Sequence, residues 1–173
     1  MNETLRLIKS RRSVKKYKDT PVSKADIEKI VEAGTWAATG LNKQSPIILA
    51  VTNKEVIKKL SRLNAGNDPF HRADPFYGAP CVLVVLADKS VSTHVYDGSL
   101  VMGNMLLAAH SLGLGACWIH RARETFETDE GKQILSDLGI QGEYEGIGNC
   151  IVGYPDMTPA DKPRKENWVY YIN

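Results

Sequence analysis

Residues Val95–Leu112 read VYDGSLVMGNMLLAAHSL, and this stretch decides the fold. Its apolar side chains, above all those from Leu100 to Ala109, would cover nearly every face of the helix that it predicts. A helix that is apolar on all sides has to be buried. In a chain of 173 residues we therefore expect a central helix that a second subunit helps to bury.

The segments around this helix predict four strands. Cys81–Ala87 is a run of apolar β-formers, which is typical of a strand covered on both faces. Further strands are expected at Ile47–Thr52, Gly115–Ile119 and Ile147–Gly153. Strands and helices alternate along the chain, so we expect a mixed α and β protein.

The best-marked of the other helices begins after Ser23. Ser23 is a good N-cap, and Asp26 follows three residues later as a weaker capping-box partner. Val22 can pack on Ile27 across the first turn. Further helices are expected over residues 2–10, over Lys54–Asn64, and near Asp129–Leu138, where Gly139 ends the helix.

The charge balance excludes some classes of function. The chain has 22 basic and 20 acidic residues and a net charge of +2, so no global field would attract nucleic acid or a membrane surface. No stretch reaches the ~20 apolar residues of a membrane span, and the N-terminus has no apolar signal core. The composition predicts one domain over residues 1–173, in the cytoplasm.

The cysteines and histidines predict no metal site. Cys81, Cys117 and Cys150 lie far apart in apolar stretches, which favours buried, reduced thiols. The four histidines are scattered, with no ligand partner at a spacing of three or four residues.

A cationic segment near the N-terminus, Arg11-Arg12-Ser13-Val14-Lys15, is the first candidate site. Alternate residues of an extended chain point the same way, so Arg11, Ser13 and Lys15 would share one face. Two cations and a hydroxyl on one face suit a phosphate, because arginine can donate two hydrogen bonds to it. The spacing alone favours a solvated basic patch, and a nucleic-acid patch is a third interpretation, which the near-neutral net charge weakens.

Two further segments could contact a flat ligand. The loop Ala37–Pro46 combines small residues with the amides of Asn42 and Gln44, which offer both donors and acceptors. By itself the segment indicates only a loop that ends a helix. The run Gly113–Arg121 is rich in glycine, but Trp118 stands at the third glycine position of a dinucleotide fingerprint. The run also leaves a helix to enter a strand, so the Rossmann interpretation fails.

In this order, the segments resemble the FMN-dependent nitroreductases. The shared motifs are R-R-S-x-K-x-Y near the N-terminus, a small-residue loop ending N-x-Q-x-P, and G-L-G-x-C-W-I after a long apolar helix. The late motif I-V-G-Y-P and the basic Lys162-Pro163-Arg164-Lys165 follow. The match runs along the whole chain, which is similar to the shorter branch of that family.

The resemblance implies an α+β fold with three layers, α-β-α, around a mostly antiparallel central sheet. It also implies an intertwined homodimer with FMN at the subunit interface and NADH or NADPH as electron donor. The acceptor would be a small molecule such as a nitroaromatic or a quinone, reduced in a ping-pong cycle. The chemistry would be centred on flavin, with the protein supplying position and electrostatics.

The resemblance also implies which residues hold FMN, in three groups. The first would grip the phosphate and ribityl chain, and consists of Arg11, Arg12, Ser13 and Lys15, with Lys162 and Arg164 of the tail. The second would come from the other subunit, and consists of Thr39, Gly40, Asn42 and Gln44. The third would line the ring, and consists of Trp118, Ile119, His120 and Arg121. Lys15 is a candidate to stabilise negative charge on reduced flavin, and His120 a candidate to face the substrate.

The chain departs from the family pattern in three places. The loop reads A-A-T-G where the family often has A-P-S, and Ser45-Pro46-Ile47 replaces the common P-W. These changes blur the contacts expected of the loop. His120-Arg121 stands where many members have Gly or Glu, which leaves the substrate preference open.

Alternatives remain at this point. The chain could be a flavin enzyme with another acceptor (an enone or a halogenated aromatic), a protein that stores flavin, or a nucleic-acid-binding module built on residues 9–18. Phe70, Phe76 and Tyr77 could form an aromatic lid over the substrate or pack in the core or dimer interface. The tail aromatics should pack on something, for which the partner subunit is a candidate.

Overall fold

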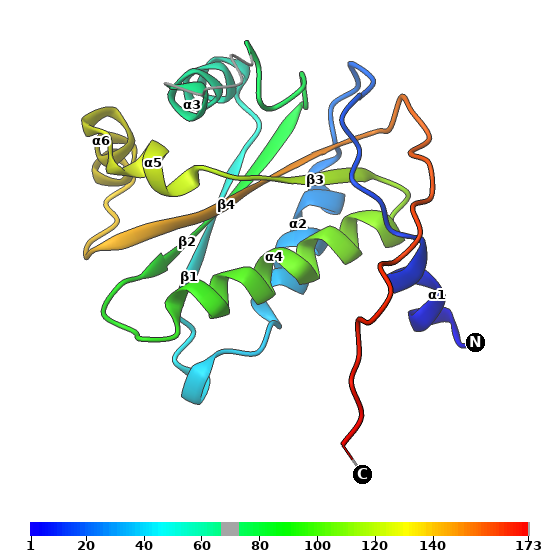
Figure 1. Cartoon of the computed structure of the whole chain (residues 1–173). Helices are drawn as coiled ribbons and strands as arrows, with labels where there is room; N and C mark the ends of the chain where they lie inside the picture. Colours follow the sequence, from blue (N-terminus) through cyan, green and yellow to red (C-terminus); the bar gives the residue numbers. More distant parts are fainter. Residues whose placement is uncertain (67–72, 173) are drawn as a thin grey trace.

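A four-stranded antiparallel sheet forms the centre of the molecule. The computed structural model describes residues 1–66 and 73–172. The strands are β1 (Pro46–Val51), β2 (Cys81–Asp88), β3 (Gly115–Ile119) and β4 (Tyr144–Gly153), in the spatial order β1-β2-β4-β3. All three strand pairs are antiparallel, as predicted (Figure 1).

Strand β2 is covered on both faces. Its alternate residues Cys81, Leu83 and Val85 belong to one apolar cluster, whereas Val82, Val84 and Leu86 belong to another. Side chains of a strand point alternately to opposite faces, so each cluster fills one side of the sheet. The prediction of a strand buried on both faces is confirmed.

Helices form the two outer layers. Helix α2 (Lys24–Thr35) and helix α4 (His94–Ser111) pack on one face, with α1 (Glu3–Ser10) against the end of α4. Helices α3 (Lys54–Ala65), α5 (Ala122–Glu127) and α6 (Asp129–Asp137) cover the other face (Figure 1). The three-layer α+β fold is confirmed.

Helix α2 begins where its capping signal predicts. The Ser23 hydroxyl oxygen accepts a hydrogen bond from the Asp26 N–H at 3.1 Å, which satisfies one of the unpaired donors of the first turn. Val22 and Ile27 are both buried in the same cluster. The N-cap and the apolar contact across the first turn are both confirmed.

Helix α4 is only partly buried within one chain. Met102, Met105 and Ala109 are fully buried against the sheet and α2. In contrast, Tyr96 is 72% exposed and Leu100 is 51% exposed. The predicted burial of α4 by a second subunit would apply to this exposed face.

Three local features depart from the prediction. Helix α5 was not expected, and neither was the 3₁₀ turn Gly40–Asn42. Strand β4 begins at Tyr144 rather than at Ile147, because it follows β2 through a bulge between Val85 and Leu86.

The three cysteines are free and buried, as predicted. Burial raises the pKa of the Cys81 thiol to about 12, so it stays protonated at neutral pH. Within residues 1–66 and 73–172, no helix has the length and apolar character to cross a membrane. The same residues contain no cluster of three or more His, Cys, Asp or Glu arranged to hold a metal ion.

Candidate functional site

The cationic segment runs beside β3 in the same direction. Ser13 forms a parallel bridge with Ala116, and the Val14 N–H donates a hydrogen bond to the Ala116 carbonyl at 3.1 Å. The fit is close, because a Cβ on Gly115 would lie 2.8 Å from the Val14 side chain. Arg11 therefore lies toward the start of β3, and Lys15 toward its end.

The side chains of the segment alternate as an extended chain requires. Val14 points inward and is buried, whereas Ser13 and Lys15 are exposed. The Lys15 ammonium lies 5.6 Å from the centre of the Tyr77 ring. The predicted shared face of Ser13 and Lys15 is therefore present.

A cavity of about 320 Å³ lies at the Arg11 end of this segment. Arg12 donates hydrogen bonds to the carbonyls of Lys9 and Arg11, at 2.6 and 2.8 Å, and pairs with Asp161 of the tail. Its buried Nε has no hydrogen-bond partner within the described part of the chain. The lining consists of Ser10, Arg11, Arg12, Val14, Leu106, His110, Gly113–Ala116, Pro155, Met157–Pro159 and Asp161.

His110 reaches this cavity from the last turn of α4. Its Nε2 lies 2.7 Å from the hydroxyl oxygen of Ser10. Burial, and then the positive charges of Arg11 and Arg12, lower the pKa of His110 below its usual value. The cavity therefore carries the positive charges of Arg11 and Arg12, the latter paired with Asp161, beside a neutral imidazole.

At the other end, buried amides hold the backbone that follows β3. Asn64 donates from Nδ2 to the His120 carbonyl at 2.8 Å, and Asn149 donates to the Ile119 carbonyl at 3.4 Å. Arg121 adopts a left-handed conformation, with φ of 70°, and the His120 side chain is exposed. The chain thus turns sharply away from the sheet just beyond Lys15.

The loop Thr39–Gln44 lies elsewhere, beside the first turn of α4. The Gly40 N–H and the Ser45 hydroxyl both donate to the Asp97 carboxylate, each at 2.9 Å. The 18 residues of α4, at 1.5 Å each, span about 27 Å between this loop and the Arg11 end. Figure 1 shows the cyan loop and the blue N-terminal segment at opposite ends of α4. One chain does not bring these two predicted groups together.

The tail carries its two predicted phosphate ligands in an exposed, extended course. Lys162 and Arg164 follow Asp161, the residue that pairs with Arg12. Trp168, Tyr170 and Tyr171 are 70%, 82% and 85% exposed. The tail leaves the body of the molecule (Figure 1), so among the described residues these aromatics are largely uncovered, although the Lys165 ammonium lies 4.8 Å from the centre of the Trp168 ring.

A model of the Nitroreductase family matches residues 8–157, from the cationic segment to the end of the I-V-G-Y-P motif. The chain belongs to the Nitroreductase family.

Relatives in the nitroreductase family match along the full chain. A nitroreductase with bound FMN from Bacteroides fragilis has a TM-score of 0.89 and 27% identity, with 100% of each chain covered. A candidate NADH dehydrogenase/NAD(P)H nitroreductase from Archaeoglobus fulgidus is 30% identical over 97% of this chain and 100% of its own length. FMN reductase (NAD(P)H) of Bacillus subtilis is 27% identical over 95% of this chain and 70% of its own length.

The predicted aromatic lid of this nitroreductase needs correction. Phe76 is 1% exposed and packs in the apolar cluster beneath α3 and α5, so the core interpretation is confirmed for it and the lid interpretation is wrong. Tyr77 packs partly against the same cluster, while Lys15 lies over its ring. Phe70 lies outside the described residues.

Sequence reasoning missed three buried polar residues of this nitroreductase. Asp97, Asn64 and Asn149 each support a predicted site segment from behind through hydrogen bonds. For Asp97 and Asn149 the available signal is a polar residue within an apolar stretch, since a buried polar group requires a partner. Asn64 stands in a polar stretch and gives no such signal.

Proposed function

We propose that this chain is an FMN-dependent oxidoreductase, which takes reducing equivalents from NADH or NADPH and passes them to a nitroaromatic, a quinone or a similar small molecule. One observation carries the proposal. The cationic segment runs parallel to β3, with arginines at its start and Lys15 beside the turn at its end. An elongated ligand would fit along this segment, with an anionic end at the arginines and a flat end near Lys15. The names of the Bacteroides fragilis and Bacillus subtilis relatives support FMN as that ligand.

The phosphate end would lie in the cavity beside Arg11. Arg11 and Arg12 line it, and the unpartnered Nε of Arg12 is a donor of the kind that a phosphate accepts from. Asp161 pairs with Arg12 and brings the adjoining Lys162 near the same place, so Lys162 and Arg164 can add charge there. Ser13 would contact the ribityl chain from the exposed face of the segment.

The ring end would lie near Lys15 and the Trp118–Arg121 backbone. Bound FMN would supply the hydride chemistry, accepting two electrons at its ring and releasing them to an acceptor. Lys15 offers a positive charge where negative charge develops on reduction. Asn64 holds the His120 carbonyl and Asn149 holds the Ile119 carbonyl, so the backbone at this end is fixed before the ligand arrives.

We infer that two subunits share each site. The loop of Thr39, Gly40, Asn42 and Gln44 cannot reach the cationic segment of its own chain, because α4 separates them by about 27 Å. An antiparallel pairing of two α4 helices would bring each loop to the other chain's segment. The exposed face of α4, with Tyr96 and Leu100, and the exposed tail aromatics favour such an intertwined homodimer.

Anaerobic titration tests the function. The purified protein, loaded with FMN, is titrated with NADH and then NADPH while the flavin absorbance is followed. Loss of the oxidised flavin spectrum, and its return when menadione or a nitroaromatic is added, is the expected result. A flavin that stays oxidised with both donors would contradict a reductase and favour flavin storage. A protein that takes up no FMN would contradict both.

A further inference from the structure

We propose that Asp97 is a positioning residue for flavin binding, and that it acts on the site of the other subunit. Its carboxylate would hold the loop Thr39–Gln44 in the shape that reaches FMN bound by the partner. This inference rests on the proposed function, because it requires a flavin site shared between two chains.

Asp97 is buried in the first turn of α4 and accepts three hydrogen bonds. Only 2% of the residue is exposed. Oδ1 accepts from the Gly40 N–H at 2.9 Å, while Oδ2 accepts from the hydroxyls of Ser45 at 2.9 Å and Thr93 at 3.1 Å. One side chain therefore ties the start of the loop and the residue after its end to the start of α4.

The form of Asp97 that accepts these hydrogen bonds is the ionised carboxylate. Burial raises the pKa of Asp97, but the hydrogen bonds from Gly40, Ser45 and Thr93 outweigh burial and lower the pKa below its usual value. Hydrogen bonds to an ionised acceptor are stronger than neutral ones. The anchor is therefore strong at neutral pH.

The loop has a conformation that depends on such an anchor. Leu41, Asn42 and Gln44 have φ of 50°, 54° and 48°, in the left-handed region that non-glycine residues seldom adopt. Such residues persist only where the surrounding structure determines them, and they gather at functional sites. At Gly40 a Cβ would clash with the Thr93 hydroxyl, so the loop is seated closely on α4.

The loop offers its side chains outward. Leu41 is 93% exposed, and the amides of Asn42 and Gln44 are exposed next to it, joined by a hydrogen bond of 3.1 Å. A rigid loop that presents an apolar side chain and two amides is suited to contact another molecule. Since the cationic segment of the same chain lies at the far end of α4, the contact falls on the partner's site.

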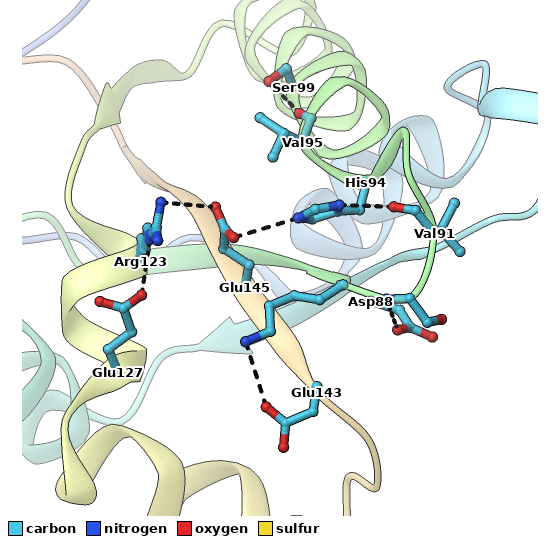
Figure 2. A network of polar contacts seen from close by, with 11 residues as sticks. Asp88, Val91, His94, Val95, Ser99, Arg123, Glu127, Glu143 and Glu145 are labelled. Atoms are coloured by element: carbon cyan, nitrogen blue, oxygen red, sulfur yellow. Dashed lines mark hydrogen bonds and ion pairs between the residues drawn. The ribbon is translucent and has the colours of Figure 1, made fainter.

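A second anchor at the start of α4 offers a matched control. His94 Nδ1 lies 2.8 Å from the Val91 carbonyl, and its Nε2 lies 3.5 Å from Glu145 on β4. Arg123 lies 3.9 Å from the same carboxylate (Figure 2). Within the described part of the chain, none of these hydrogen bonds and ion pairs ends on the loop Thr39–Gln44, so we expect Glu145→Gln to perturb the start of the helix but not the loop.

The first test measures FMN affinity by titration of the flavin-free protein. We expect Asp97→Ala to weaken FMN binding by roughly tenfold or more, Asp97→Asn to recover part of the loss, and Glu145→Gln to change it by less than about twofold. Asn keeps an acceptor for the Gly40 N–H, which explains the partial recovery. Ser45→Ala removes one hydrogen-bond donor to the same carboxylate, and it replaces Asp97→Ala as the test variant if Asp97→Ala does not fold.

The second test uses mixed dimers, because an effect of Asp97 confined to its own subunit would give a different result from an effect on the partner's site. Asp97→Ala subunits and Arg11→Ala subunits carry different tags and are purified as heterodimers. If the loop of one subunit acts on the site of the other, both substitutions affect one of the two sites and neither affects the other. Half of the sites then have the wild-type affinity for FMN. If the loop acts on the site of its own subunit, each site is affected by one substitution and no site regains the wild-type affinity for FMN. That result would overturn the inference.

The outcomes separate the inference from the proposed function. A wild-type protein that binds no FMN would refute the proposed function, and the inference with it. A wild-type protein that binds FMN, together with an Asp97→Ala variant of equal affinity, would refute only the role of Asp97.

Discussion

Replacing Arg11 with alanine should weaken the binding of FMN but leave the binding of riboflavin unchanged. Arg11 lines the cavity at the start of β3, and riboflavin lacks the phosphate that we expect there. A hydrogen bond to a charged group contributes about 1.5–3 kcal/mol. Since 1.4 kcal/mol is a factor of ten, the dissociation constant for FMN should rise about 10- to 150-fold.

Lys16→Ala is the matched control for this variant. It removes one positive charge just after the cationic segment, but the Lys16 ammonium pairs with Asp156 at 2.7 Å and its side chain is 68% exposed. The charge of Lys16 therefore acts on the cavity only through solvent. At ~0.1 M salt the screening length is about 10 Å, so its loss should hardly change the FMN affinity.

The assay is a flavin fluorescence titration of the two variants and the wild type, at one ionic strength, with FMN and with riboflavin. The reasoning would be refuted if Arg11→Ala weakened both ligands equally, since its effect would then not pass through the phosphate. It would also fail if Lys16→Ala cost as much FMN affinity as Arg11→Ala, because a general electrostatic field would then explain both.

Three further results are expected. Gly40→Ala should weaken FMN binding in titrations, because its Cβ would clash with Thr93, and the added substitution Thr93→Ala should restore part of the affinity. Met105→Ala should lower the free energy of unfolding by about 2–5 kcal/mol in urea melts, since Met105 is fully buried between α4 and α2. Burial and the neighbouring arginines lower the pKa of His110, so the unfolded chain takes up a proton near pH 6.5 while the folded chain resists it. Stability should therefore fall as the pH drops below about 6.5, and melts of His110→Gln should show a smaller fall; an equal fall would contradict this.

The buried strand and the central helix could be predicted because they follow from apolar patterns, whereas the three layers were implied by the resemblance to the nitroreductases. Strand β2 was recognisable as a run without polar residues, and α4 as a helix without a polar face. The capping residue Ser23 marked the start of α2 to the residue. Each of these signals is local, so one sequence is sufficient to read it.

The missed elements are those that depend on contacts distant in sequence. Helix α5 has six residues and follows the N-cap residue Arg121, which is left-handed and offers no side-chain cap. The shape of the loop around Leu41 depends on Asp97, which is 56 positions later in the chain. Asp97 itself stood within an apolar helix, where the sequence pattern shows a polar residue but not its partners.

The structure places the predicted site residues in two separate groups within one chain. The alternation of Ser13 and Lys15 could be read from the sequence, whereas the approach of the tail to Arg12 through Asp161 could not. The distance between the loop and the cationic segment could not be read from the sequence, because it is set by the length of α4 and by the end of α4 at which each of them lies. The homodimer that would unite the two groups stays a prediction.

The most direct test of a shared flavin site is the mass of the particle that carries FMN. Sedimentation of the FMN-loaded protein, followed at the absorbance of oxidised flavin, measures the size of that particle across a dilution series. We expect all bound flavin to travel with a dimer that holds one FMN per chain, and dilution into monomers to release it. A stable monomer that sediments with its FMN would contradict the account.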